Sequence, residues 1–310
     1  MTQPPAKPAP PAFREINFRV RDGLKLYGRH YPARSDMSVG RPVLCLPGLT
    51  RNSRDFEAVA EYLSQTAIPR RDVYTIDFRG RGLSDWDPNW KNYTVPLEAM
   101  DVIDFATLNQ LHDAAIIGTS RGGLVAMIIA AMQPSMIGCT ILNDIGPVLE
   151  PDGLLRIASY VGKTPIPGSW SEATASVKQG NKRQFPNATD EDWAAIAKQL
   201  FNEKNGRPSQ GYDPKIGNAF SVLDGPMPAI WPQFDALSKR PVMVIRGEET
   251  DLLSEQTVET MCRRHPRCES YTVPGEGHAP LLRDQPTLQR IAAFLQATDS
   301  AKHSAVDMVA

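Results

Sequence analysis

Several features that would assign a protein to other functional classes are absent from this sequence. Its 310 residues carry a formal net charge of −1, so no broad positive field is present to attract nucleic acid or anionic lipid. No segment approaches the roughly 18 consecutive apolar residues of a membrane span. The first eleven residues contain five prolines and lack the apolar centre of a signal peptide. We therefore expect a flexible tail over 1–12 and a cytoplasmic protein without nucleic-acid partners.

Cysteine is scarce, and the four cysteines are scattered. Cys45 and Cys139 lie within apolar runs, where small buried hydrophobes fit, so no disulfide is implied. Cys262, His265 and Cys268 supply only three metal ligands, whereas structural zinc sites usually have four. No metal site is predicted.

Nucleotide-binding loops are also missing. The segment Val161-Gly162-Lys163-Thr164 ends like a phosphate-binding loop, but Ile157 stands where the leading glycine should be. The glycines around Ser120 do not have the G-x-G-x-x-G spacing of a dinucleotide site. The sequence thus predicts no cofactor.

What the chain does contain is the pentapeptide Gly118-Thr119-Ser120-Arg121-Gly122, between the apolar runs 114–117 and 124–132. This context predicts a strand, a sharp turn and a helix, which is the setting of a G-x-S-x-G nucleophile elbow. Ser120 would then project from the carboxyl edge of a sheet. The alternative is an ordinary glycine-rich turn that happens to contain a serine.

A nucleophilic serine needs a base, and the base needs an orienting group. Of the five histidines, His278 has the most suitable context, a turn-rich loop over 274–280 that follows a strand-like segment. We expect the other four to have no catalytic role: His30, His112, His265 and His303.

The acid is expected at another strand end, between the serine and the histidine in chain order. Asp251 follows the strand-like segment 241–247, and Leu252 and Leu253 can anchor its loop, so we assign it as the acid. Asp144 follows a second strand-like segment and is the alternative.

Acyl transfer also needs donors for the oxyanion. One is expected from the backbone N–H of Arg121, which follows the nucleophile, and the other from the N–H of Leu49. Gly48 would permit unusual backbone angles that turn this second N–H inward. Pro47-Gly48 is also a common dipeptide of simple turns.

From about Phe13 to Leu295 these residues resemble the α/β-hydrolase superfamily, in particular its small, cap-bearing serine esterase, lipase-like and lactonase branch. The segment 77–84, DFRGRGLS, is similar to the family's D-x-R-G-x-G-x-S scaffold turn. The resemblance implies Ser120 as nucleophile, Asp251 as acid and His278 as base. It implies Leu49 and Arg121 as oxyanion donors, although Pro47 replaces a histidine that often braces this loop.

The expected fold is α/β, a mainly parallel, doubly wound sheet with helices on both faces. An antiparallel hairpin turning at Asp22-Gly23 precedes it. Six short strand candidates follow, separated by helical segments such as Asp55 to Gln65 and Leu97 to Leu111. They are Val43 to Leu46, Val73 to Asp77, Ala114 to Gly118, Ile137 to Leu142, Val242 to Arg246 and Glu269 to Val273.

A helical cap is expected after the sixth strand. The predicted division is a core of 13–146 and 235–298, a cap of 147–234 and a C-terminal tail of 299–310. The cap should hold helices near 154–161, 171–179 and 190–201, the last with Asp190 as its N-cap.

Tryptophans are expected in two settings around the cap. Trp170 and Trp193, with Phe201, should fill the core of the cap, and Trp86 and Trp90 should lie nearer the pocket mouth.

The predicted activity is hydrolysis of a small-molecule carboxylic ester or lactone through an acyl-enzyme on Ser120, without cofactor or metal. The same triad would also serve carbon–carbon bond hydrolysis or cofactor-free perhydrolysis. A slow-turnover receptor or signalling protein on the hydrolase fold is the non-catalytic alternative. The substrate and the oligomeric state are not specified by the sequence.

Overall fold

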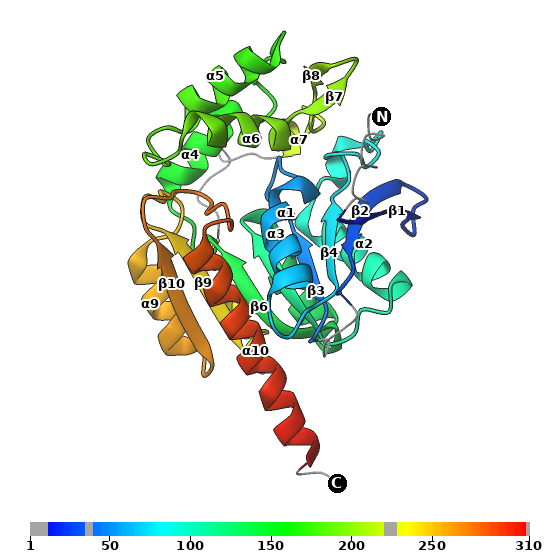
Figure 1. The fold of residues 1–310 in the computed structure, drawn as a ribbon, viewed down its shortest axis with the longest axis vertical. Coiled ribbons are helices and arrows are strands. Elements are labelled where there is room, and N and C mark those ends of the chain that lie inside the picture. The colour runs from blue at the N-terminus through cyan, green and yellow to red at the C-terminus, as the bar shows by residue number, and fades with distance from the viewer. Residues whose placement is uncertain (1–11, 35–39, 220–227, 308–310) are drawn as a thin grey trace, which may run out of the picture.

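The computed structural model describes residues 12–34, 40–219 and 228–307. The predicted flexible tail over 1–12 lies almost wholly outside the described residues. Within them, a long mixed sheet is flanked by helices, and a second group of helices lies beyond one end of the sheet (Figure 1).

The eight strands of this sheet that the described residues form are ordered β1-β2-β4-β3-β5-β6-β9-β10. The hairpin β1–β2 is antiparallel, as expected, and β2 also runs antiparallel to β4. All the pairings from β4 to β10 are parallel. The bounds are β1 (Arg14–Arg19), β2 (Lys25–Tyr31), β3 (Val43–Leu46), β4 (Val73–Asp77), β5 (Ala114–Thr119), β6 (Ile137–Asn143), β9 (Val242–Gly247) and β10 (Cys268–Val273).

The central strands are apolar on both faces because helices cover both. In β3, Leu44 and Leu46 belong to one core cluster, while Val43 and Cys45 belong to the other. This alternation is the period-two geometry of a strand buried on both sides.

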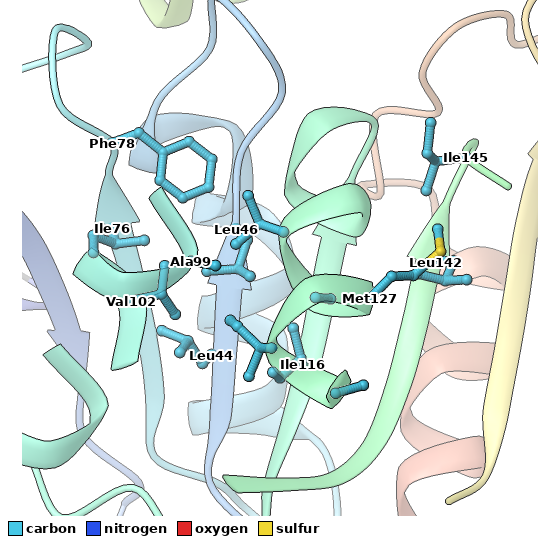
Figure 2. Packing of buried hydrophobic residues seen from close by; sticks show 14 of the residues in the cluster. Leu44, Leu46, Ile76, Phe78, Ala99, Val102, Ile116, Met127, Leu142 and Ile145 are labelled. Carbon is cyan, nitrogen blue, oxygen red and sulfur yellow. The ribbon is translucent and has the colours of Figure 1, made fainter. Parts of the chain in front are cut away.

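The first face is covered by α2, α3, α8 and α9, and the second by α1 and α10. Figure 2 shows Ala99 and Val102 of α2 with Leu44 and Ile76 in the first cluster. The helices are α1 (Glu57–Glu61), α2 (Val95–Leu108), α3 (Arg121–Met132), α8 (Trp231–Asp235), α9 (Glu255–Arg264) and α10 (Gln285–Asp307). Shorter helical turns occupy Ser53–Phe56, Tyr62–Thr66, Trp90–Asn92 and Pro134–Met136.

The C-terminal segment differs from its prediction as a tail beginning at residue 299. Helix α10 continues to Asp307, and the Asp299 carboxylate lies 2.6 Å from Nη2 of the buried Arg71. A buried arginine requires a charged partner, so Asp299 ties this part of α10 to the core.

The insertion between β6 and β9 is mainly helical, and we call residues 150–219 the cap segment. Figure 1 shows its elements gathered beyond one end of the sheet. They are α4 (Pro151–Tyr160), α5 (Trp170–Asn181), α6 (Asp190–Leu200), β7 (Asn202–Lys204), β8 (Arg207–Ser209) and α7 (Ile216–Ala219).

Three local features of this region differ from the predictions. The N-cap of α6 is Thr189, which forms a capping box with Asp192, while Asp190 pairs with Lys178. The small hairpin β7–β8 was not foreseen. Helix α8 lies within the predicted cap range, but its buried Phe234 belongs to the first core cluster.

The turn after β4 is built around buried charge. The Asp77 carboxylate accepts hydrogen bonds from the backbone N–H groups of Ser53 and Leu83, at 2.6 and 2.8 Å. A Cβ at Gly82 would lie 2.0 Å from Asp77 Oδ2, and its φ is +56°, so only glycine fits there. The buried Arg79 bonds Asp101 and Asp87. This turn has the scaffold role that the resemblance implied.

Candidate active site

Ser120 stands on a strained turn between β5 and α3. Its backbone has φ 50° and ψ −115°, and left-handed φ values are uncommon for residues other than glycine. The flanking glycines permit the turn, because a Cβ at Gly122 would lie 2.1 Å from the carbonyl oxygen of Leu46. The strand, turn and helix predicted for this pentapeptide are all present.

His278 bridges Ser120 and a buried carboxylate. Its Nε2 lies 2.9 Å from Ser120 Oγ, and its Nδ1 lies 2.7 Å from Asp144 Oδ2. The three residues are far apart in sequence and come from the loops after β5, β6 and β10. With Nδ1–H donated to the carboxylate, Nε2 is free to accept the serine proton.

Asp144 is held as a hydrogen-bond acceptor at the end of β6. It has a φ of 55° and a fully buried side chain. Its Oδ1 accepts from the Gly247 N–H at 2.8 Å, and its Oδ2 also accepts from the Thr250 hydroxyl at 2.5 Å. These donors fix the carboxylate in the orientation that meets the imidazole.

Asp251, which the sequence analysis assigned as the acid, does not bond His278 in this structure. Its carboxylate forms a two-point ion pair with Arg156 of α4, at 2.5 and 2.8 Å. Burial alone would raise the pKa of Asp251, but the Arg156 hydrogen bonds and charge outweigh it and lower that pKa. Leu252 and Leu253 are buried, as expected, and the Asp251 carboxylate beside them bonds Arg156 of the cap segment.

The structure therefore places the alternative acid, Asp144, next to the histidine. The hydrogen bonds of the two carboxylates explain this, because Gly247 and Thr250 hold that of Asp144 at the histidine, whereas Arg156 holds that of Asp251 at the cap segment. The indication of this role in the sequence was the position of Asp144 directly after the strand β6.

Two backbone N–H groups near Ser120 are available for an oxyanion. Among the described residues, neither Leu49 nor Arg121 donates its N–H in a hydrogen bond. Arg121 is the first residue of α3, where helical N–H groups lack intrahelical acceptors. Gly48 does not have a left-handed φ. A Cβ there would lie 3.8 Å from Ser120 Cβ, so the loop passes within ordinary contact distance of the serine.

A buried charge network joins the two residues that carry these N–H groups. Arg121 Nε lies 2.6 Å from Glu98 Oε2, and Arg81 Nη1 lies 2.8 Å from Glu98 Oε1. Arg81 Nε in turn donates to the Leu49 carbonyl at 2.8 Å. Glu98 and Arg81 are fully buried. Arg81 thus braces the loop from which the family's frequent histidine is absent.

A cavity of about 420 Å³ contains Ser120 and His278 in its lining. Its floor comes from the loops at the carboxyl ends of β3, β5 and β10, and its walls come from the cap segment. Trp193 and Phe201 lie in the apolar cluster of the cap, as predicted, and also line the cavity. Trp86 and Trp90, expected near the pocket mouth, are not among its lining residues.

Residues 43–290 match the family model described as "Alpha/beta hydrolase family". The chain belongs to the alpha/beta-hydrolase family.

Several curated relatives of this alpha/beta hydrolase carry hydrolase or esterase names. The chain is 32% identical over 268 residues to the 3-hydroxybutyrate-oligomer hydrolase of Cupriavidus necator, covering 84% of this chain and 89% of the relative. It is 25% identical over 232 residues to esterase YbfF of Escherichia coli, covering 70% and 79%. These names support hydrolase activity in this chain.

Among solved structures, an alpha/beta hydrolase from Novosphingobium aromaticivorans is similar, with a TM-score of 0.84 and 35% identity. The match covers 93% of this chain and 99% of that one. The expected alpha/beta-hydrolase fold, a mainly parallel sheet with helices, is confirmed.

The other histidines of the alpha/beta hydrolase that the structure describes lie elsewhere. His265, weighed above as a metal ligand, has Nε2 at 3.0 Å from the Leu237 carbonyl oxygen and accepts the Arg267 N–H at Nδ1. His30 contacts Asp72 at 2.6 Å. No helix within the described ranges has both the length and the apolarity to cross a membrane.

Proposed function

We propose that this protein is a serine hydrolase that cleaves carboxylic esters, with Ser120 as nucleophile, His278 as general base and Asp144 as the orienting acid. The observation that carries the proposal is the continuous hydrogen-bonded chain Ser120–His278–Asp144 at the floor of a cavity. The serine esterase assignment follows the sequence analysis, with Asp144 in place of Asp251.

In the first half-reaction, His278 Nε2 takes the Ser120 proton while Oγ bonds to the ester carbonyl carbon. The carbonyl oxygen becomes an oxyanion, and the Leu49 and Arg121 N–H groups donate to it. Asp144 stabilises the imidazolium. As the tetrahedral intermediate collapses, His278 returns the proton to the departing alkoxide, which leaves as an alcohol.

The second half-reaction repeats these steps with water. His278 removes a proton from water, the hydroxide adds to the acyl carbon, and Ser120 leaves with the proton as a free hydroxyl. The products are a carboxylic acid and an alcohol. A lactone would give one hydroxy acid by the same chemistry.

The first substrates to test are short linear esters of hydroxy acids. The extensive match to a relative named 3-hydroxybutyrate-oligomer hydrolase supports this choice. The cavity of about 420 Å³ is within the usual size range of small-ligand sites.

Ser120→Ala is the decisive variant, assayed with 4-nitrophenyl butyrate and with the linear dimer of 3-hydroxybutyrate. We expect kcat to fall by several orders of magnitude, since loss of the nucleophile in another serine hydrolase, subtilisin, costs on the order of 10⁶. Ser135→Ala, at an exposed serine outside the cavity, is the matched control. Equal rates for Ser120→Ala and the wild type would refute the assignment.

A further inference from the structure

Two arginines line the same cavity as the reacting serine and approach it from different elements. Arg51 belongs to the loop after β3, and Arg156 belongs to α4 of the cap segment. Arg51 lies close to the reacting centre. A Cβ placed on Gly48 would lie 3.2 Å from Arg51 Cγ and 3.8 Å from Ser120 Cβ.

Each guanidinium is held along one edge by a carboxylate. Arg51 Nε and Nη2 bond Asp55 at 2.6 and 2.7 Å, and Arg156 pairs with Asp251 in the same two-point manner. Such pairing fixes the planar group and leaves further N–H donors on it. Within the described part of the chain, Arg51 Nη1 has no hydrogen-bond partner. Both side chains remain partly exposed, at 21% and 25%.

Tyr160 adds a neutral donor to this end of the cavity. It lines the cavity and interacts electrostatically with Arg156 and Arg51. Burial raises the pKa of Tyr160, which the two arginines only partly oppose, so the phenol stays protonated at neutral pH. We call Arg51, Arg156 and Tyr160 the arginine end of the cavity.

Guanidinium groups outnumber carboxylates in the lining of the cavity. Apart from His278, its charged lining residues are Arg51, Arg156 and Asp55, and Asp251 pairs with Arg156 from outside the lining. Carboxylates thus balance both guanidinium charges, and what the cavity offers a ligand is the N–H donors that these pairs leave over. A charged group on a ligand will interact more strongly in this partly enclosed site than in bulk water.

We propose that the arginine end binds a carboxylate carried by the substrate, so that the preferred substrates are esters with a free carboxylate near the cleaved bond. Linear hydroxy-acid oligomers have such a group at one end. This inference rests on the proposed function, which identifies the cavity as the active site. It adds that the preferred substrate carries a negative charge.

The test measures binding in the Ser120→Ala protein, so that it does not depend on turnover. Calorimetry gives the Kd of the linear 3-hydroxybutyrate dimer as its free acid and as its primary amide, which differ only in the terminal charge. We expect the acid to bind about tenfold or more tightly, as a charge-assisted hydrogen bond allows. Equal Kd values for acid and amide would overturn the inference.

Two substitutions should move this ratio in opposite directions. Arg51→Gln removes a positive charge and should bring the ratio of the amide Kd to the acid Kd toward one. Arg156→Gln should independently lower the same ratio. Asp55→Asn removes the competing carboxylate and should increase the ratio. The control Arg290→Gln, at an arginine on α10 that pairs with Glu269, should keep the parental ratio. A preference that survives both arginine substitutions would also overturn the inference.

Failure of this inference is distinct from failure of the proposed function. An acid preference in the Ser120→Ala protein would stand even if the wild type hydrolysed no ester. Conversely, Ser120-dependent hydrolysis of 4-nitrophenyl butyrate would stand even if acid and amide bound equally.

Discussion

The core and the α5–α6 pair of the cap segment are built differently, although both line the cavity. The central core strands are apolar on both faces, and the core encloses ion networks in which Arg79, Arg81 and Glu98 are fully buried. The α5–α6 pair has a small apolar cluster of its own around Trp193. Its connections to the core include partly exposed polar contacts such as Arg283–Asp192, at 3.1 Å.

This difference suggests a division of labour. Groups that need exact placement, such as Ser120, His278 and Asp144, stand on loops at the ends of core strands. The cap segment contributes walls, whose less buried polar contacts cost less to rearrange. Substitutions in the core should therefore affect turnover, and substitutions in the α5–α6 pair should affect substrate binding.

The largest expected effect comes from replacing each of the two candidate acids in turn. Asp144→Asn should lower kcat/KM for 4-nitrophenyl butyrate by on the order of 10⁴, as loss of the orienting carboxylate does in the serine-protease template. Asp251→Asn should lower it by less than about tenfold, because its partly exposed partner Arg156 remains in contact with solvent. A larger loss for Asp251→Asn than for Asp144→Asn would show that Asp251 is the acid.

The next largest effect should follow from Glu98→Gln, which leaves Arg81 and Arg121 without their shared carboxylate. Breaking a buried ion pair in this way typically costs about 3–5 kcal/mol of unfolding free energy. Urea unfolding measures this cost. Below the unfolding transition, kcat should fall more than KM rises, because the Leu49 and Arg121 N–H groups are less well placed. An unchanged kcat would show that the network serves stability alone.

Glu98 also predicts a pH dependence of stability. Burial would raise its pKa, but Arg121 and Arg81 outweigh burial and hold the pKa below the ordinary value of 4.5. A lowered folded-state pKa stabilises the protein above the unfolded-state pKa, and that stability is lost as pH falls through the folded-state value. The unfolding free energy should thus decline below about pH 4.5. Glu98→Gln should show a shallower decline, and an equal slope would contradict this role.

Trp193→Ala tests the stability of the α5–α6 pair. Truncation of a fully buried tryptophan typically costs about 3–5 kcal/mol, and we expect this loss to be concentrated in the α5–α6 pair. Amide hydrogen exchange should accelerate there and remain slow in β5 and β6. KM should rise more than kcat falls. Uniformly faster exchange across the sheet would mean that the two regions unfold as one unit.

The smallest effect is expected at the surface pair Lys178–Asp190 between α5 and α6. Lys178 is 49% and Asp190 84% exposed, so Lys178→Ala should change the unfolding free energy by about 1 kcal/mol or less. Thermal unfolding in low and high salt would measure it. A larger loss would show that polar pairs, rather than the Trp193 cluster, hold these helices together.

The core was predictable because local patterns and global topology agree in it. The apolar runs on both sides of Ser120 could form only a short strand and a helix, and each glycine of the turn has a steric reason. His278 was found because its loop is rich in turn residues. These signals are local, and the structure retains them.

Asp144 and the arginine end were harder to identify, because their roles depend on distant neighbours. Both Asp144 and Asp251 follow strands, and only the partners of their carboxylates, Gly247 and Thr250 for one and Arg156 for the other, decide which of them meets His278. Nothing in the sequence around Arg51 or Arg156 indicates a binding role, because the cavity that they share forms only between the cap segment and the loop after β3. The roles of Arg81 and Glu98 likewise depend on the packing of two loops, after β3 and β4, against two helices, α2 and α3.

The most direct test of the account is to locate the covalent intermediate. The protein would be treated with a fluorophosphonate, which reacts with activated serines, and digested for peptide mass spectrometry. The account predicts a single adduct at Ser120, formed rapidly in the wild type and in Asp251→Asn, and strongly slowed in Asp144→Asn. Rapid labelling of a different residue, or undiminished labelling in Asp144→Asn, would contradict it.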